Sequence, residues 1–455
     1  MGTAGGLNGS LRAGTTAGAA GRDPVIDLVR FACLALVVVG HCMMVSPVLH
    51  ADGTVTTQNT LAEQHWFEPV IWIFMVMPLF FVTGGMTGLE SWRRLSANGG
   101  TAALFIRARL LRLVRPATAL LAVMFLGLGA AQLLGVHPQV IELMAAGAGM
   151  PLWFLAAYLA AQLNIPLLAA FHARAPWRTF LLLTALVVAV DCLRGTLPLL
   201  ANINLLFLWC AVQQLGFLVA DGKLAGLSRS GLAAVTLAAN VLLGAVTGLG
   251  LYPGNMLVNL NPPNLALLLL GVSQAALMEA ARPVLEGVAS WPWLSRMLQT
   301  AGARSLTVYL WHLPLLAAMS GLLLLAPVPK PESGTPGWWW ARAVVLPALL
   351  LLLLPVIAAF GRLEDTPTAA PGSGTKPAAV GAAVVVVFLP VADAALGGLT
   401  LALLGTGAAF FALTQLILGA VPWRSPVPGR KTAAAGTRGR AGRRRGRKGI
   451  ATGVK

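Results

Sequence analysis

Charged residues are scarce in this sequence. Asp, Glu, Lys and Arg make up only 10% of its 455 residues, whereas about a quarter of a typical soluble domain is charged. Hydrophobic residues reach 57%, and the mean hydropathy is +0.78. Apolar runs of about 20 residues recur along the chain, and each is long enough to cross a bilayer as a helix. We therefore predict an all-α protein, a polytopic transmembrane helical bundle.

Several catalytic and metal-binding motifs are also missing. The sequence has no HExxH pair, no GxSxG elbow, no zinc-type cysteine pairs and no phosphate-binding glycine loop. These absences argue against a hydrolase-type serine domain, and we expect no metal site. Four cysteines lie in or near apolar segments and never as CxxC, so we interpret them as packing residues: Cys33, Cys42, Cys192 and Cys210.

The apolar runs divide the chain into twelve predicted spans. A ten-span core over 25–361 is followed by a Pro- and Gly-rich linker at 362–377 and a final apolar hairpin at 378–421. The predicted spans are 25–48, 69–89, 111–134, 151–171, 178–199, 203–220, 231–251, 264–281, 303–326, 338–360, 378–394 and 397–421.

The two ends of the chain are predicted to be disordered. The first 24 residues are rich in Gly, Ala and Thr and have no apolar signal-peptide core. Residues 422–455 are basic and Gly-rich. We expect this tail to lie against anionic lipid. Nucleic acid is the less favoured partner because no aromatic residues interleave the charges.

The charges of the connections predict the topology. If the N-terminus is cytoplasmic, Lys and Arg gather in the even-numbered connections, while the connection at 49–68 contains acids but no Lys or Arg. This alternation follows the positive-inside rule. It places both termini in the cytoplasm and the protein in the inner (plasma) membrane as a multi-pass chain. The high Ala, Gly and Arg content favours a bacterial source.

The first predicted span carries a polar stripe. At about 100° per residue, Asp27, Arg30 and His41 fall close to one face, and His41 lies about 16 Å deeper than Arg30. We place His41 near the middle of the span. A buried ionisable group there indicates function, and imidazole suits a general base or acyl relay. The alternatives are a hydrogen-bonded packing histidine and, for Asp27 with Arg30, a local ion pair.

An arginine cluster opens the third predicted span. Arg109, Arg112 and Arg115 are spaced i, i+3 and i+6, so that they form a fan at one helix end. Guanidinium groups bind phosphate bidentately, which favours a phosphorylated cosubstrate. The alternative is a plain positive-inside anchor.

Two later segments add polar and aromatic candidates. Ser305, Tyr309 and His312 share one helix face, and His312 lies at a depth comparable to that of His41. The alternative is a hydrogen-bonded structural pair.

In the fourth predicted span, Trp153 is either a substrate contact or an interfacial anchor. Tyr158 lies deeper and needs a partner for its hydroxyl. The small residues of 76–88 favour close helix packing or accommodation of an acyl chain.

Four of these stretches, in the first, third, fourth and ninth predicted spans, resemble motifs of the acyltransferase-3 family. This is a family of integral membrane O-acyltransferases, the type that O-acetylates carbohydrates. The resemblance rests on Arg30-x10-His41, on an Arg-x-x-Arg pair whose register is ambiguous, on Trp153-Phe154-Leu155 and on Tyr309-x-x-His312. It implies transfer of an acyl group, with acetyl as the default, from cytoplasmic acyl-CoA to an acceptor hydroxyl.

The resemblance also implies the role of individual residues. His41 would be the catalytic histidine with Arg30 as its motif partner, and the arginine fan would hold the coenzyme A phosphates. No permanently bound cofactor is implied. A carbohydrate, glycolipid or glycoside would be the acceptor. A secondary transporter or flippase is the competing function, because twelve spans with buried His, Asp and Arg are also transporter features.

Overall fold

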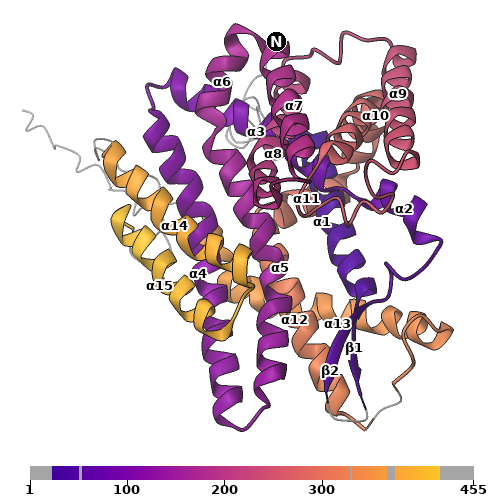
Figure 1. Ribbon diagram of the computed structural model, residues 1–455. Helices are drawn as coiled ribbons and strands as arrows, with labels where there is room; N and C mark the ends of the chain where they lie inside the picture. The colour runs from indigo at the N-terminus through magenta and orange to yellow at the C-terminus, as the bar shows by residue number, and fades with distance from the viewer. Residues whose placement is uncertain (1–22, 51–53, 328–329, 366–374, 421–455) are drawn as a thin grey trace, which may run out of the picture.

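The chain folds as a bundle of helices with one small β-hairpin (Figure 1). The computed structural model describes residues 23–50, 54–327, 330–365 and 375–420. In order, the elements are α1 (Pro24–Met44), β1 (Val45–Leu49), β2 (Val55–Asn59), α2 (Phe67–Phe74), α3 (Met77–Ala97), α4 (Ala102–Leu133), α5 (Pro138–Leu163), α6 (Ile165–Arg174), α7 (Pro176–Leu193), η1 (Pro198–Ile203), α8 (Asn204–Ala220), α9 (Arg229–Gly248), α10 (Leu265–Ala289), α11 (Pro292–Gly302), α12 (Ser305–Leu325), α13 (Pro336–Phe360), η2 (Gly361–Glu364), α14 (Pro377–Gly397) and α15 (Leu401–Ile417).

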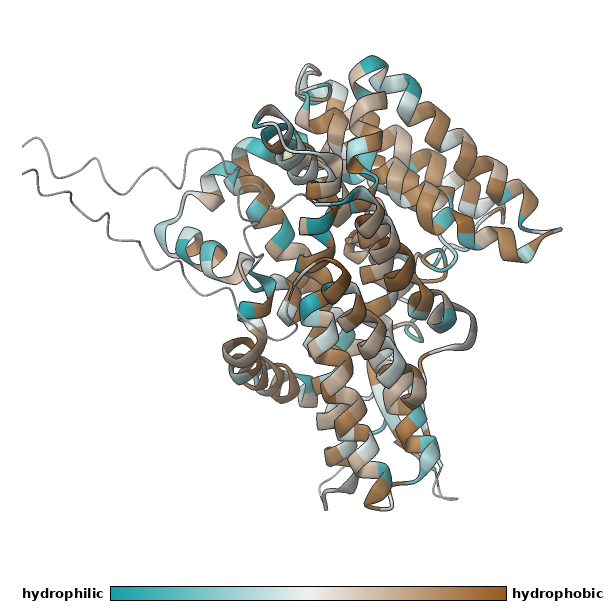
Figure 2. Cartoon of the chain, turned by 90° about the vertical axis from the view of Figure 1, so that its left-hand side faces the viewer, coloured by the Kyte–Doolittle hydropathy of each residue, from teal (hydrophilic) through white to brown (hydrophobic). Residues whose placement is uncertain are grey.

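The prediction of an all-α, polytopic transmembrane bundle is confirmed. Among the described residues, eleven helical segments are long and apolar enough to cross a membrane, and α15 is a shorter apolar helix. Apolar residues make up much of the helices (Figure 2), and large apolar side chains such as Ile73 and Leu133 are 75% and 91% exposed. Such a surface suits contact with lipid chains better than contact with water.

The first span ends earlier than its sequence predicts. Asp23 caps the start of α1, where its Oδ1 accepts from the Val25 N–H at 2.9 Å. The helix stops at Met44, because Pro47 lies in the next segment and 45–49 pairs with β2 as an antiparallel hairpin. His41 therefore lies in the last turn of α1, and the predicted position near the middle of the span is wrong.

Several other spans differ from their predicted bounds: the span expected at 69–89 is divided into α2 and α3, which ends at Ala97, and the one expected at 264–281 extends to Ala289 as α10. The span expected at 111–134 is α4, which starts at Ala102, nine residues earlier. The span expected at 151–171 is divided: α5 covers Pro138–Leu163, and a separate short helix, α6, follows it. Pro166 stands in the first turn of α6, where a proline is tolerated and its missing N–H is not needed.

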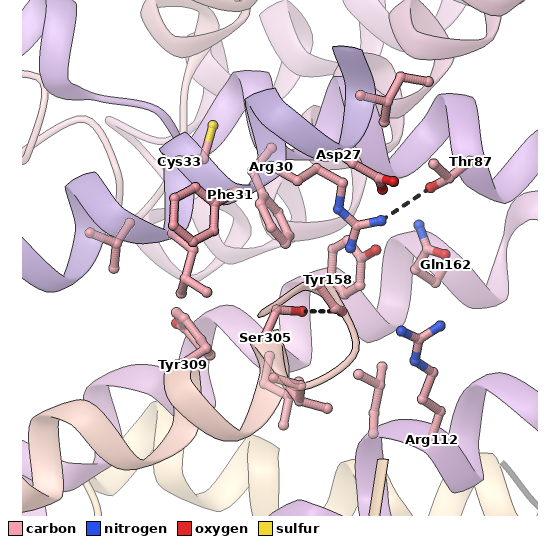
Figure 3. A pocket seen from close by; sticks show the side chains of 18 of the residues that line it. Asp27, Arg30, Phe31, Cys33, Thr87, Arg112, Tyr158, Gln162, Ser305 and Tyr309 are labelled. Atoms are coloured by element: carbon pink, nitrogen blue, oxygen red, sulfur yellow. Dashed lines mark hydrogen bonds between the residues drawn. The ribbon is translucent and has the colours of Figure 1, made fainter. Parts of the chain in front are cut away.

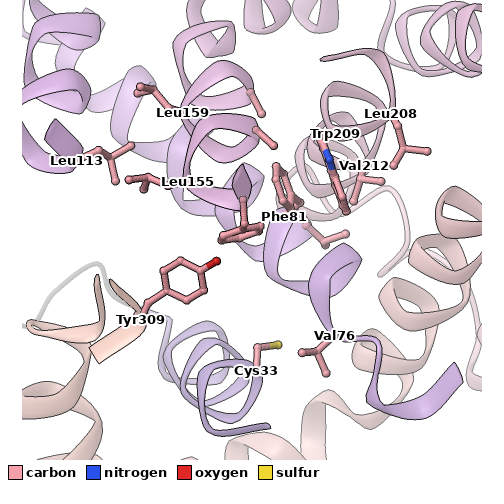
Figure 4. Close-up of a cluster of buried hydrophobic side chains, with 14 of the residues drawn as sticks. Cys33, Val76, Phe81, Leu113, Leu155, Leu159, Leu208, Trp209, Val212 and Tyr309 are labelled. Atoms are coloured by element: carbon pink, nitrogen blue, oxygen red, sulfur yellow. The ribbon is translucent and has the colours of Figure 1, made fainter. Parts of the chain in front are cut away.

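Glycines bring α3 and α8 into direct backbone contact. A Cβ at Gly85 would collide with the carbonyl oxygen of Gln213, and one at Gly216 would collide with that of Val82. Phe81 of α3 stacks on the buried Trp209 of α8, with ring centroids 4.1 Å apart (Figure 4). The small residues of 76–88 thus allow the close helix approach that their sequence predicts.

The C-terminal hairpin packs against the core. In Figure 1, α14 and α15 lie beside α4, and the Gln415 Nε2–H donates to Thr118 Oγ1 at 2.8 Å. The segment that we expected to be a linker, 362–377, begins in packed structure. Glu364 of η2 is buried and accepts from the Thr307 N–H at 2.7 Å at the start of α12. The predicted basic tail and nearly all of the predicted N-terminal segment lie outside the described residues.

Candidate active site

A cavity of about 420 Å³ opens between α1, α3, α4, α5, α11 and α12 (Figure 3). Its lining has a charged part and an aromatic part. Of the residues that the sequence selects, it contains Asp27, Arg30, Arg109, Arg112, Tyr158, Ser305 and Tyr309. The structure thus gathers selected residues from four separate predicted spans into one space.

The charged part of the cavity carries three arginines that form no ion pair with any carboxylate among the described residues. Arg30 lies 5.3 Å over the ring of Phe80, and its Nη1–H donates to Thr87 Oγ1 at 3.5 Å. Arg109 lies 5.0 Å over the Phe105 ring. Within the described part of the chain, Arg30, Arg109 and Arg112 form no ion pair with a carboxylate. Their charge therefore remains available to an anionic ligand.

The aromatic part of the cavity lies between the arginines and two histidines. Phe154 packs against Tyr309 with ring centroids 5.1 Å apart and against Phe80 at 5.6 Å. Tyr158 approaches the same Phe80 ring at 5.4 Å. These rings give the middle of the cavity apolar walls, which suit the uncharged portion of a substrate.

His41 and His312 meet where the cavity-lining faces of α1 and α12 continue beyond Val37 and Tyr309. The His41 Nδ1 and His312 Nε2 atoms are 2.8 Å apart, and the two rings are nearly parallel, at 16°. His312 is fully buried, whereas His41 is partly exposed. Two helices distant in sequence thus hold both imidazoles next to the cavity that contains the arginines.

Hydrogen bonding fixes the tautomer of both rings. The His312 Nδ1 atom lies 2.6 Å from the carbonyl oxygen of Tyr309, which can only accept, so this nitrogen carries the proton. In the neutral ring, His312 Nε2 is then an acceptor, and the His41 Nδ1–H must donate to it. The remaining nitrogen of His41, Nε2, keeps its lone pair. It is the basic and nucleophilic atom of the pair.

Two of the candidate residues from the sequence, Arg115 and Trp153, do not line the cavity. The Arg115 Nη1–H donates to the Asp365 carbonyl oxygen at 2.8 Å, and this side chain does not line the cavity. The fan therefore divides, and Arg109-x-x-Arg112 is the pair that faces the cavity. Trp153 is also absent from the lining, and its Nε1–H is buried without a hydrogen-bond partner in the described structure. Its neighbours Phe154 and Leu155 line the cavity instead.

Sequence reasoning missed several cavity residues because they are either uncharged or placed in connections. Thr87 and Gln162 line the cavity with neutral polar groups, and Glu90 and Arg94 line it at the end of α3. A polar side chain within an apolar run was the available signal for Gln162. Arg94 resembles an ordinary positive-inside flanking residue, and Glu90 lies just outside the predicted span 69–89.

Charged networks also tie helices together around the cavity. The Arg282 guanidinium bridges Asp23 at 2.8 Å and Glu279 at 2.8 Å, which joins α10 to the start of α1. Farther away, Asp221 after α8 accepts from Arg93 of α3 and lies 3.1 Å from His172 Nε2. The hydrogen bond from Arg93 is the main cause that lowers the pKa of Asp221. Burial lowers the pKa of His172, although Asp221 opposes that shift.

Comparison with known protein families matches residues 23–362, which is more than half of the chain, to the acyltransferase-3 family, whose model is described as an acyltransferase domain. The matched range contains the cavity and both histidines and ends within η2. No curated protein and no solved structure matches the chain.

Proposed function

Because this match covers more than half of the chain, the protein belongs to the acyltransferase-3 family and is a membrane acyltransferase, and from that premise we propose the reaction that it catalyses. It moves an acyl group, acetyl by default, from acyl-CoA to a hydroxyl group of a carbohydrate, glycolipid or glycoside acceptor. The acyl-CoA is a cosubstrate, and no permanently bound cofactor takes part.

The observation that carries this proposal is the arrangement of charge along one cavity. Arg30, Arg109 and Arg112 line the cavity, whereas the His41–His312 pair lies beyond its apolar walls. Along α1, the eleven residues from Arg30 to His41 span about 16 Å. Coenzyme A has a matching division, with phosphates at one end, a flexible uncharged arm and a thioester at the other end.

In the proposed reaction, the arginines bind the phosphates and the arm extends along the aromatic walls. His41 Nε2 takes the proton from the acceptor hydroxyl while that oxygen attacks the thioester carbonyl. The new C–O bond forms, the C–S bond breaks, and the proton passes from His41 to the leaving thiolate. Alternatively, His41 Nε2 attacks the thioester carbonyl itself, the C–S bond breaks and the thiolate leaves. The acceptor hydroxyl then attacks the acyl group on Nε2, the N–C bond breaks, and the hydroxyl proton passes to the thiolate. Both routes use the same nitrogen atom.

The loop charges support one orientation of this reaction. With both termini in the cytoplasm of a multi-pass plasma-membrane protein, the Asp23 end of α1 faces the cytoplasm. The arginines are then nearer the side on which acyl-CoA is available, and the His41 end of α1 approaches the opposite side. An acceptor that never enters the cytoplasm can be modified in this way.

The test is turnover of radiolabelled acetyl-CoA by purified protein in liposomes, with carbohydrate and glycolipid extracts as acceptors. We expect label release or transfer by the wild type and loss of both in His41→Ala. His50→Ala is the matched control, because His50 is exposed and its ring contacts Thr56 of β2. A wild-type protein that neither binds nor turns over acetyl-CoA would refute the choice of donor.

A further inference from the structure

A buried amide in the cavity wall lacks a hydrogen-bond partner. Gln162 of α5 is 1% exposed and lines the cavity, and its Oε1 accepts no hydrogen bond in the described structure. A buried polar atom normally has a partner, because leaving it unpaired costs free energy. Because Gln162 lines the cavity, a ligand bound there can supply the missing hydrogen-bond donor.

The surrounding network fixes which way this amide points. The Gln213 Nε2–H donates to the Ala161 carbonyl oxygen at 2.9 Å, so Gln213 Oε1 faces Gln162 as an acceptor. The Gln162 Nε2–H groups donate to that Gln213 Oε1 at 3.2 Å and to the Gly84 carbonyl oxygen at 3.3 Å. A flipped amide would place Oε1 against two acceptors, so the unpartnered atom must be oxygen.

The position of Gln162 restricts which chemical groups of a ligand could donate to its Oε1. In Figure 3 this amide lies beside Thr87, between Arg30 and Arg112, while Tyr309 lies farther along the cavity. Phosphate oxygens beside these arginines only accept hydrogen bonds, and an acyl chain has no polar hydrogen. A ligand that carries phosphates at one end must therefore present an N–H or O–H directly beyond them.

We propose that Gln162 Oε1 accepts a hydrogen bond from an amide N–H in the pantetheine arm of the acyl donor. This inference rests on the proposed acyl-CoA donor and deepens it. Between the phosphates and the sulfur, the arm carries one hydroxyl group and, beyond it, two secondary amides, and we assign the donor to one of these amides. Gln162 is thus a binding residue for the arm, distinct from the arginines that bind the phosphates.

The experiment changes the ligand first. Purified wild-type protein in detergent binds labelled coenzyme A in competition with two analogues, each with an ester in place of one amide. Replacing N–H by oxygen removes one donor and keeps the shape of the arm. We expect one analogue to bind about tenfold more weakly, which corresponds to one lost hydrogen bond, and the other to bind like coenzyme A.

The protein is then changed to identify the partner. Gln162→Leu should bind coenzyme A more weakly and no longer distinguish the two analogues. Gln415→Leu is the matched control: Gln415 is also 1% exposed with an unpartnered Oε1, but it lies outside the cavity lining. This control should distinguish the analogues as the wild type does.

The outcomes separate the two proposals. If the wild type binds coenzyme A and both analogues equally, the Gln162 hydrogen bond is refuted while the acyl-CoA donor stands. If Gln162→Leu still distinguishes the analogues, another residue accepts the bond and the inference is equally refuted. If the wild type binds none of the three ligands, the donor itself is wrong, and the inference is overturned with it. The wild-type comparison remains decisive even if Gln162→Leu does not fold.

Discussion

Replacing His312 tests whether the histidine pair acts as a unit. In His312→Leu, the His41 Nδ1–H loses its acceptor, the only partner recorded for it in the described structure. Neither the ring orientation nor the tautomer of His41 is then fixed. Leaving one buried neutral donor unpaired costs about 1–3 kcal/mol. If that cost falls on the transition state, kcat decreases about 5- to 150-fold.

The size of this effect should be smaller than that of losing His41 itself. Removal of a general base typically lowers the rate about 100- to 10,000-fold. Because His312 acts through His41, the double variant should be no slower than His41→Ala alone. His312→Gln should recover part of the rate, because its amide oxygen can accept from the His41 Nδ1–H.

The assay is single-turnover transfer from labelled acetyl-CoA in liposomes, with the folded fraction of each variant measured by gel filtration. A purely structural role for His312 would lower the amount of folded protein without changing the rate per folded molecule. The reasoning is refuted if His312→Leu transfers at the wild-type rate. It is also refuted if the losses of the two single variants multiply in the double variant.

Three further predictions concern the donor site and the fold. Arg112→Ala should raise the KM for acyl-CoA about 10- to 100-fold through loss of a charge-assisted hydrogen bond. Arg115→Ala should leave this KM unchanged, and titration of each variant with acyl-CoA measures the difference. Gly85→Ala should destabilise the α3–α8 contact by about 1–3 kcal/mol in thermal unfolding, while Gly127→Ala, with open space around it, should not. Both folded pKa values in the His172–Asp221 pair lie below their ordinary values, so the unfolded chain binds more protons in acid. The stability of the fold should therefore be constant above about pH 6.5 and decrease below it, first through His172. The variant His172→Asn should show a smaller decrease. If the melting temperature of His172→Asn depends on pH as that of the wild type does, this account is contradicted.

The sequence predicts the helical class and much of the site because both follow from local periodicity. The apolar runs define the spans, and the eleven-residue spacing of Arg30 and His41 places both on one face of α1. For His41 and His312, the sequence predicts only that the two residues lie at a similar depth on different helices. The hydrogen bond that joins them, at 2.8 Å, depends on how α1 and α12 pack, which no local pattern specifies.

The features that the sequence could not predict depend on tertiary contacts. Arg109 and Arg115 have the same residue type and belong to one fan. Of the two, Arg109 lines the cavity, whereas Arg115 donates to the carbonyl oxygen of Asp365, the residue that follows η2. The β1–β2 hairpin shortens α1, since Pro47 and the pairing with β2 override the apolar run that continues through Val48. The sequence shows Gln162 only as a polar residue in an apolar run, and the orientation of its amide follows from tertiary contacts with Gly84 and Gln213.

The position of Arg30 and His41 on one helix has a consequence for donor selectivity. One helix carries both Arg30 and His41, so the distance between the phosphate-binding end and the reacting nitrogen cannot adjust to different donors. In the proposed reaction, a carrier with a shorter or longer arm would place its thioester out of reach of His41 even when its phosphates bind well. The acyl group is attached beyond the sulfur, so the distance from Arg30 to His41 does not restrict its length. The protein should therefore discriminate strictly among carriers and only weakly among short acyl chains.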